Sequence, residues 1–231
     1  MLVKYCQYAK YENVRVTIPR TVVVATDYFD AFIRNNGLEY VLTTEMTDEE
    51  ILSEFVSSTL PYKLREALKA YVRTVSGPLA VRSSSKLEDS HYQPFAGIYS
   101  TYMIPYTEGN EDRQLRLLQK AIKSVYASTY FAASKAYVQS SQNLIAEEKM
   151  AVVIQEVCGT EQDGLFFPTL SGVARSINYY PIGDETPEEG VCNIALGLGK
   201  LVVDGGRTLR FSPRYPQKVL QTSTPELALR D

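Results

Sequence analysis

Hydrophobic residues at the start of the chain form first a continuous run and then a helical pattern. The run RTVVVA at residues 20–25 predicts a short buried strand. The apolar residues that follow recur at helical spacing, which predicts a helix capped by Asp27 and ended by Gly37. Thr47 and Glu50 form a capping-box pattern ahead of the next apolar stripe, so a second helix is expected there.

The middle of the chain continues with helices and short strands. Pro61 is expected in the first turn of a third helix. Residues 79–84 (LAVRSS) predict a strand, and residues 98–104 predict a strand that returns from the loop between them. An apolar stripe over residues 115–125 predicts a fourth helix, and Ser128 is the expected cap of a fifth.

The last part of the chain has a different pattern. Residues 150–157 (MAVVIQEV) are apolar and β-branched, and further strand candidates lie at 165–168, 172–180 and 191–196. The polar segment 142–149 is the best internal boundary. The sequence therefore predicts an α+β fold with a helix-rich first part and a strand-rich C-terminal part.

Composition and charge exclude several classes of protein. With 45% hydrophobic and 22% charged residues, the 231-residue chain has the composition of a globular protein. A net charge of −3 gives no basic face for nucleic acid. No run approaches the ~18 apolar residues of a membrane span, and the first residues lack a signal-peptide pattern. Three widely spaced cysteines fit a reducing cytoplasm better than a disulfide framework or a zinc site.

Arg82 is the first candidate for chemistry, because it leaves a predicted strand into a serine-rich loop. A guanidinium group matches phosphate oxygens in pairs, and serine and backbone N–H donors can complete a phosphate cradle. Gly97, at the far end of the loop, permits the backbone to come close to a bound phosphate. Alternatively, the serines make turn contacts and Arg82 pairs with Glu88 or Asp89. The residues alone favour this second interpretation.

Three further features have both a functional and a structural interpretation. Gln155, Glu156 and Val157 end a strand, where the backbone could read an adenine edge or simply leave the sheet. Residues 195–200 (ALGLGK) resemble a phosphate loop, but the required glycine and Ser/Thr positions do not match, which favours a loop between strands. His91, the single histidine, has no Cys, Asp or His cluster of ligand spacing around it, so we expect an ordinary loop residue.

The segment LAVRSSSKLEDSHYQPFAGIYSTY, residues 79–102, resembles the signature of one family, the pyruvate phosphate dikinases and phosphoenolpyruvate synthases. The resemblance lies in a Val-Arg-Ser-Ser strand exit, an acidic pair, Phe-Ala-Gly and a Thr-containing strand. VTIPRTVVVATDYFDAFIRNNGL, KAIKSVYASTYFAASKAY, MAVVIQEVCGTEQDGLFF and NIALGLGKLVVDGG are similar to other family segments and occur in the family's order. The resemblance covers most of the chain.

This resemblance implies an ATP-grasp fold, in which two α+β lobes hold ATP between them. The lobes expected here are residues 1–146 and the start of a second lobe at 147–231. The resemblance implies that Arg82 contacts the ATP phosphates and that Thr101 lies on the phosphate-facing strand. It further implies a closing loop that contains Gly97, and an adenine-binding hinge formed by Gln155, Glu156 and Val157.

The reaction that the resemblance implies is phosphoryl transfer, in which positioning and charge stabilisation dominate catalysis. Mg²⁺ neutralises the phosphates, and a histidine on a separate swivelling domain carries the phosphoryl group to pyruvate, which a further domain binds. We expect a phosphotransferase fragment that is inactive by itself, with no catalytic residue and no metal ligand assigned in this chain. The family's Gly-Gly-Lys segment, the acidic and glutamine ligands of its second lobe and its Ser-His segment are not found in the sequence.

Two departures favour an alternative. Ile98 follows Phe-Ala-Gly where the family has glutamine, and Lys200 follows Gly-Leu-Gly where the family has glutamate. The alternative is a non-catalytic nucleotide-sensing or interaction module on the same fold.

Overall fold

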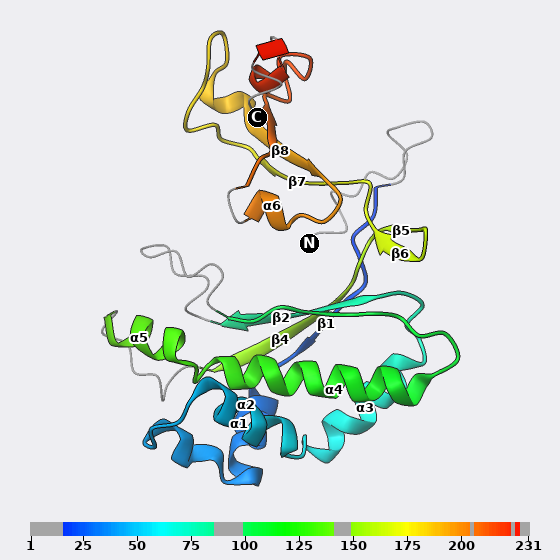
Figure 1. The fold of residues 1–231 in the computed structure, drawn as a ribbon, viewed down its shortest axis with the longest axis vertical. Helices are drawn as coiled ribbons and strands as arrows, with labels where there is room; N and C mark the ends of the chain where they lie inside the picture. The colour runs from blue at the N-terminus through cyan, green and yellow to red at the C-terminus, as the bar shows by residue number, and fades with distance from the viewer. Residues whose placement is uncertain (1–15, 86–98, 141–148, 204–205, 223–224, 227–231) are drawn as a thin grey trace. The chain divides into compact units, whose positions relative to one another are not determined.

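A computed structural model describes residues 16–85, 99–140, 149–203, 206–222 and 225–226 of the chain (Figure 1). It divides into two compact units, Met1–Val157 and Cys158–Asp231. Helices and antiparallel sheets occur together, which confirms the predicted α+β class.

Unit 1 is built on a four-stranded antiparallel sheet with the order β1-β4-β2-β3. Its elements, in chain order, are β1 (Thr21–Val24), α1 (Thr26–Asn36), the 3₁₀ helix η2 (Leu38–Leu42), α2 (Asp48–Ser57), α3 (Tyr62–Val72), β2 (Leu79–Ser85), β3 (Tyr102–Ile104), α4 (Glu111–Ser128), α5 (Ala132–Ser140) and β4 (Met150–Glu156). Figure 1 shows the helices gathered on one side of this sheet.

Local signals in the sequence explain where the first helices start and stop. Gly37 ends α1 with a left-handed φ of 63°, and its N–H donates to backbone carbonyls of the last turn, as predicted. Thr47 and Glu50 form the predicted capping box at the start of α2. Asp27 is not the cap of α1: Ala25 holds that position, and Asp27 lies in the first turn, where a negative charge is still favourable. Pro61 is the N-cap of α3 and not part of its first turn.

Two other boundaries differ from the prediction because side-chain hydrogen bonds intervene. Ser128 is the last residue of α4 and donates its hydroxyl to the Val125 carbonyl at 2.7 Å, so it does not cap the next helix. The Ala132 N–H at the start of α5 donates instead to the Asp48 carboxylate at 2.8 Å. β3 is shorter than the strand expected from residue 98, because the Ser100 N–H points to the Ser128 hydroxyl, 3.5 Å away, and not into the sheet.

The core of unit 1 lies between the sheet and the helices. α1 and α4 contact the sheet directly, and α2 and α3 pack on α4. A cluster of aromatic rings joins α1, α2 and α4, with ring centroids 5.0–5.7 Å apart in the pairs Phe29–Tyr126, Phe32–Tyr126 and Phe32–Phe55. Phe32, Phe55 and Tyr126 are fully buried, so this cluster holds the helical layer against one face of the sheet.

Unit 2 contains a two-stranded and a three-stranded antiparallel sheet, β5-β6 and β7-β8-β9. Its elements are β5 (Thr160–Gln162), β6 (Leu165–Phe167), β7 (Leu170–Arg175), the 3₁₀ helix η4 (Pro187–Glu189), β8 (Val191–Leu196), α6 (Lys200–Val203), β9 (Leu209–Phe211) and the 3₁₀ helix η5 (Leu220–Thr222). The strand predicted over residues 172–180 corresponds to β7, which ends at Arg175.

The sequence pattern places β4 with the C-terminal part, but in the structure β4 pairs with both β1 and β2 in the sheet of unit 1. The assignment of residues 1–146 and 147–231 to the two lobes of an ATP-grasp stays a prediction. No helix in the described part of the chain is long and apolar enough to cross a membrane.

Candidate functional site

The sheet of unit 1 has one face against the helices and one face that exposes side chains. Because side chains alternate along a strand, the buried Val152 and Ile154 of β4 point to the helical layer, and Val153 and Gln155 point to the opposite face. Val23 and Met103 lie on this opposite face by register and are 60% and 59% exposed. We call it the open face.

The strand registers arrange the open face in rows that cross the sheet. One row, the Gln155 row, consists of Thr21, Gln155, Ala80 and Met103 from four neighbouring strands. The next row, the Arg82 row, contains Val23, Val153 and Arg82. Two residues along a strand separate the rows, a distance of about 7 Å.

Arg82 lies on the exposed surface in the middle of β2, paired with Val153 of β4. No described residue forms a hydrogen bond or an ion pair with its guanidinium group. Glu88 and Asp89, its alternative partners, lie outside the described residues. Arg82 is therefore a cationic donor on the open face with no partner in the described part of the chain.

Thr101 immediately precedes β3 and is exposed. The pairing of β3 with β2 begins with Tyr102 opposite Val81, so Thr101 lies one residue before the paired strand. Of the residues proposed to bind nucleotide, Arg82 and Gln155 fall in two adjacent rows of one face, and the role of Thr101 stays a prediction. Gly97 and His91 lie outside the described residues, and the role predicted for Gly97 stays a prediction.

Gln155 has a fixed side-chain amide. Its Nε2 lies 3.1 Å from the Thr21 hydroxyl oxygen, and that hydroxyl lies 3.0 Å from the Pro19 carbonyl. A hydroxyl has a single hydrogen, which Thr21 donates to Pro19, so its oxygen accepts from the NH₂ group of Gln155. This leaves the carbonyl oxygen and the second N–H of the Gln155 amide available to a ligand.

Glu156 points to the other face of the sheet, because it alternates with Gln155. Its carboxylate is 3.5 Å from Arg20 Nε and is only 22% exposed. Burial raises the pKa of the nearby Tyr71 hydroxyl, and the Glu156 charge raises it further. The Glu156 side chain therefore has an internal ionic partner, and only its backbone can serve the predicted adenine hinge.

The backbone donors at the end of β4 are also used within unit 1. The Glu156 N–H donates to the Arg20 carbonyl and the Val157 N–H to the Pro78 carbonyl, both at 2.9 Å. The hinge interpretation of Gln155, Glu156 and Val157 stays a prediction. In the present geometry, the N–H groups of Glu156 and Val157 are not available to a base, so recognition would use carbonyl groups and the Gln155 amide.

The Gly-Leu-Gly segment is a tight connection between β8 and α6. Gly197 has a φ of 74°, and its N–H donates to the Thr169 carbonyl at 3.1 Å. The Ser171 hydroxyl donates to the Gly197 carbonyl at 2.6 Å. These contacts bind the segment to the start of β7. The segment is a loop, but it joins strand β8 to the short helix α6 and not two strands as interpreted from the sequence.

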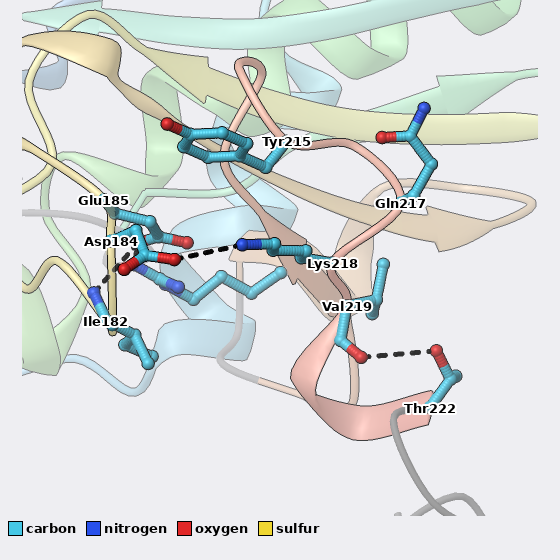
Figure 2. Close-up of a pocket in the computed structure, with 10 residues that line it drawn as sticks. Ile182, Asp184, Glu185, Tyr215, Gln217, Lys218, Val219 and Thr222 are labelled. Carbon is cyan, nitrogen blue, oxygen red and sulfur yellow. Dashed lines mark hydrogen bonds and ion pairs between the residues drawn. The ribbon is translucent and has the colours of Figure 1, made fainter.

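A pocket of about 410 Å³ in unit 2 was not foreseen from the sequence (Figure 2). Its charged side chains are paired: Lys218 lies 3.1 Å from Asp184, and Arg210 lies 3.1 Å from Glu185. Glu185 also accepts from the Ile182 N–H and from Asn178. The charges that line the pocket thus neutralise one another, and the network ties the loop before η4 to β9.

The donor set of the open face does not fit a protein-held Mg²⁺ ion, which prefers carboxylate ligands beside phosphate oxygens. Neither row contains an acidic residue. In the ranges described here, no group of three or more His, Cys, Asp or Glu side chains is close enough to hold a metal. No chemical step is therefore assigned to a metal bound by these residues.

Known proteins are similar to most of this chain. An uncharacterized phosphotransferase, YvkC of Bacillus subtilis (strain 168), is 31% identical over 198 residues, which are 83% of this chain and 20% of that protein. A phosphoenolpyruvate synthase of Aeropyrum pernix is 27% identical over 212 residues, or 82% of this chain and 24% of that protein. The chain thus spans a quarter or less of the length of these two relatives. Residues 4–223 match the family of the pyruvate phosphate dikinase AMP/ATP-binding domain, and the chain belongs to this family.

Proposed function

We propose that this chain is the ATP-binding part of a phosphoenolpyruvate synthase-like phosphotransferase and that it holds ATP on the open face of unit 1. The observation that carries the proposal is Arg82, whose guanidinium group has no partner among the described residues and lies in the row next to Gln155. Family membership supports ATP as the ligand. The phosphoenolpyruvate synthase among the relatives supports pyruvate as the final acceptor.

In this proposal the chain binds and orients the nucleotide but does not accept the phosphoryl group. Arg82 would hold phosphate oxygens through its paired donors, and Thr101 would add a hydroxyl. The acceptor would be a histidine on a swivelling domain outside this chain, and another domain would bind pyruvate. Mg²⁺ would enter with ATP, held by phosphate oxygens, in keeping with the two described rows, which contain no carboxylate.

The test is a calorimetric titration of Mg-ATP into the protein and into Arg82→Ala. Loss of a charge-assisted hydrogen-bond partner costs about 1.5–3 kcal/mol, so we expect roughly 10- to 100-fold weaker binding. Arg116→Ala is the matched control: it removes the same charge from the exposed surface of α4, which packs on the other face of the sheet. Equal ATP affinity in folded Arg82→Ala and Arg116→Ala would remove Arg82 from the site.

The alternative proposal is a nucleotide-sensing module without transfer activity, which Lys200 in place of the family's glutamate favours. The two proposals differ in one product. The complete protein supplied with ATP and pyruvate forms phosphoenolpyruvate, visible by phosphorus NMR, only if it is a phosphotransferase. ATP binding that depends on Arg82 without this product would support the sensing module.

A further inference from the structure

Unit 1 contains a cavity in its helical layer, where the chain turns from β3 into α4. The cavity has a volume of about 350 Å³, within the range of small-molecule sites. Its walls come from the end of α3 and the residue Val75 beyond it, from the turn at 106–110, and from the first residues of α4. α3 and α4 pack on each other (Figure 1). We call this space the Gln114 cavity, after the residue whose side chain is the most unusual in its lining.

Gln114 is buried without hydrogen-bond partners for its side-chain amide. The residue is 2% exposed, yet neither Nε2 nor Oε1 has a partner among the described residues. A buried amide without partners is costly, and buried polar groups in folded proteins are rarely left in this state. Because Gln114 lines the cavity, the missing partners are expected in the molecule that fills it.

The chemistry of the amide limits what that molecule is. A primary amide presents a carbonyl acceptor and an NH₂ donor side by side in one plane. An anion satisfies only the NH₂ group, and a cation satisfies only the carbonyl oxygen. A neutral group with an N–H next to a C=O satisfies both at once, as in a carboxamide, a lactam or a ureide.

The charges around the cavity also disfavour an anion. A helix N-terminus by itself attracts negative charge, but Glu111 and Asp112 already occupy the first turn of α4. Arg73 is paired with Glu111 at 3.3 Å, so the charge of Asp112 is left over in the lining. Val72 and Val75, which are buried, add an apolar wall that suits a ring.

We propose that the Gln114 cavity binds a small neutral ligand that carries an amide group, a carboxamide, lactam or ureide, through paired hydrogen bonds to Gln114. None of its lining residues lies in the Gln155 row or the Arg82 row. The cavity is thus a second site, separate from the open face, and the proposal does not depend on ATP binding.

Benzamide is the probe, and benzoate and benzylamine are its matched anionic and cationic controls with the same ring. NMR of ¹⁵N-labelled protein follows the side-chain amide signals of Gln114, assigned through Gln114→Met. We expect benzamide to shift these signals with a Kd of about millimolar, as befits so small a ligand. Benzoate and benzylamine should bind at least tenfold more weakly. No response to benzamide, or an equal response to all three molecules, overturns the proposal.

Gln114→Met keeps the length of the side chain and removes its amide, so benzamide should bind at least tenfold more weakly. Gln119→Met is the matched control: it makes the same change at a half-buried position of the same helix, outside the cavity. The control should bind benzamide as the wild-type protein does. Equal weakening in both variants would show that the loss does not come from the cavity.

A measurement on the wild-type protein keeps the test independent of the folding of Gln114→Met. Nuclear Overhauser contacts should join the ring protons of benzamide to the methyl groups of Val72, assigned through Val72→Ile. Excess Mg-ATP should not displace benzamide, because the lining of the cavity contains no residue of the open face. Absent contacts to Val72, or displacement by Mg-ATP, would place benzamide elsewhere and overturn the proposal.

Asp112 provides a test of the charge argument. Asp112→Asn removes the unpaired carboxylate from the first turn of α4, so benzoate binding should strengthen by about two- to fivefold, with benzamide unchanged. Glu49→Gln removes an exposed carboxylate from the first turn of α2 and should change neither affinity. If Asp112→Asn strengthens benzoate no more than Glu49→Gln does, local charge does not select the neutral ligand and this part of the proposal is wrong.

Discussion

At the scale of single residues, the end of β4 shows how neighbours in sequence take different roles. Gln155 faces the open side of the sheet, whereas the Glu156 carboxylate pairs with Arg20 on the other. Arg20, which immediately precedes β1, also donates to the Thr74 carbonyl at 2.7 Å. Its side chain thus connects the segment before β1 with the segment after α3 and with the end of β4. Arg20 is therefore a structural clamp that holds the backbone beside the candidate site.

We predict that Arg20→Ala destabilises unit 1 by about 1–2 kcal/mol, because it removes a carbonyl hydrogen bond and leaves a half-buried carboxylate without its partner. Urea unfolding followed by circular dichroism measures this difference. Arg116→Ala, an exposed control on α4, should change the free energy of unfolding by less than about 0.5 kcal/mol. Equal unfolding curves for the two variants would contradict the clamp.

At the scale of elements, unit 2 depends on a buried polar network more than on apolar packing. Asn178 is buried and bonds to Glu185, and Arg210 of β9 reaches both residues at 3.1 Å. Burial by itself raises the pKa of Glu185, but the hydrogen bonds from Arg210, the Ile182 N–H and Asn178 bring it below its ordinary value. The charged form of Glu185 is thus the form that holds the loop to β9.

This pKa gives a pH prediction with a definite sign. A carboxyl group with a lowered folded-state pKa adds stability above its unfolded-state pKa, and that stability is lost as the pH falls through the folded-state value. We expect the urea midpoint of unit 2, followed by NMR signals of β9, to fall from about pH 5 downward. Glu185→Gln should lower the midpoint at neutral pH and flatten this decline.

Glu188→Gln is the matched control, since Glu188 is exposed on η4, next to the same loop. Its pH dependence should follow that of the wild-type protein. A wild-type decline in Glu185→Gln would show that another group is responsible.

At the scale of the whole molecule, the two units differ in how much apolar surface they bury. The large hydrophobic core lies entirely between Val24 and Ile154, within unit 1. Among the residues described in unit 2, Val191 and Ala195 are the buried hydrophobic ones. Since apolar burial is the main favourable contribution to folding, unit 1 should be the more stable unit.

Hydrogen exchange measured by mass spectrometry tests this difference in the intact chain. We predict that the amides of β2 and β4 exchange at least tenfold more slowly than those of β7, β8 and β9. The reason is that β2 and β4 pack on the hydrophobic core of unit 1, whereas β7, β8 and β9 open at a lower free energy. Equal protection in the two sheets would show that unit 2 gains its stability in another way.

Much of the secondary structure was determined by the sequence alone, because it depends on local interactions. Gly37 ends a helix by its own conformational freedom, and the Thr47–Glu50 capping box closes within one turn. The alternation in β2 and β4 likewise fixes which residues share a face. Within the candidate site, this alternation is enough to predict that Arg82 and Ala80 share one face of β2, and that Gln155 and Val153 share one face of β4.

The tertiary structure decided which strands are neighbours, and the site depends on that. The sequence pattern places β4 with the C-terminal part, but β4 lies between β1 and β2 and brings Gln155 beside Thr21 and Ala80. The sequence pattern predicts Ser128 as a helix cap, because a local pattern does not show the hydrogen bond that its hydroxyl donates within α4. Strand order and register arise from packing between distant segments, so no local pattern could have placed Thr21, Gln155, Ala80 and Met103 in one row.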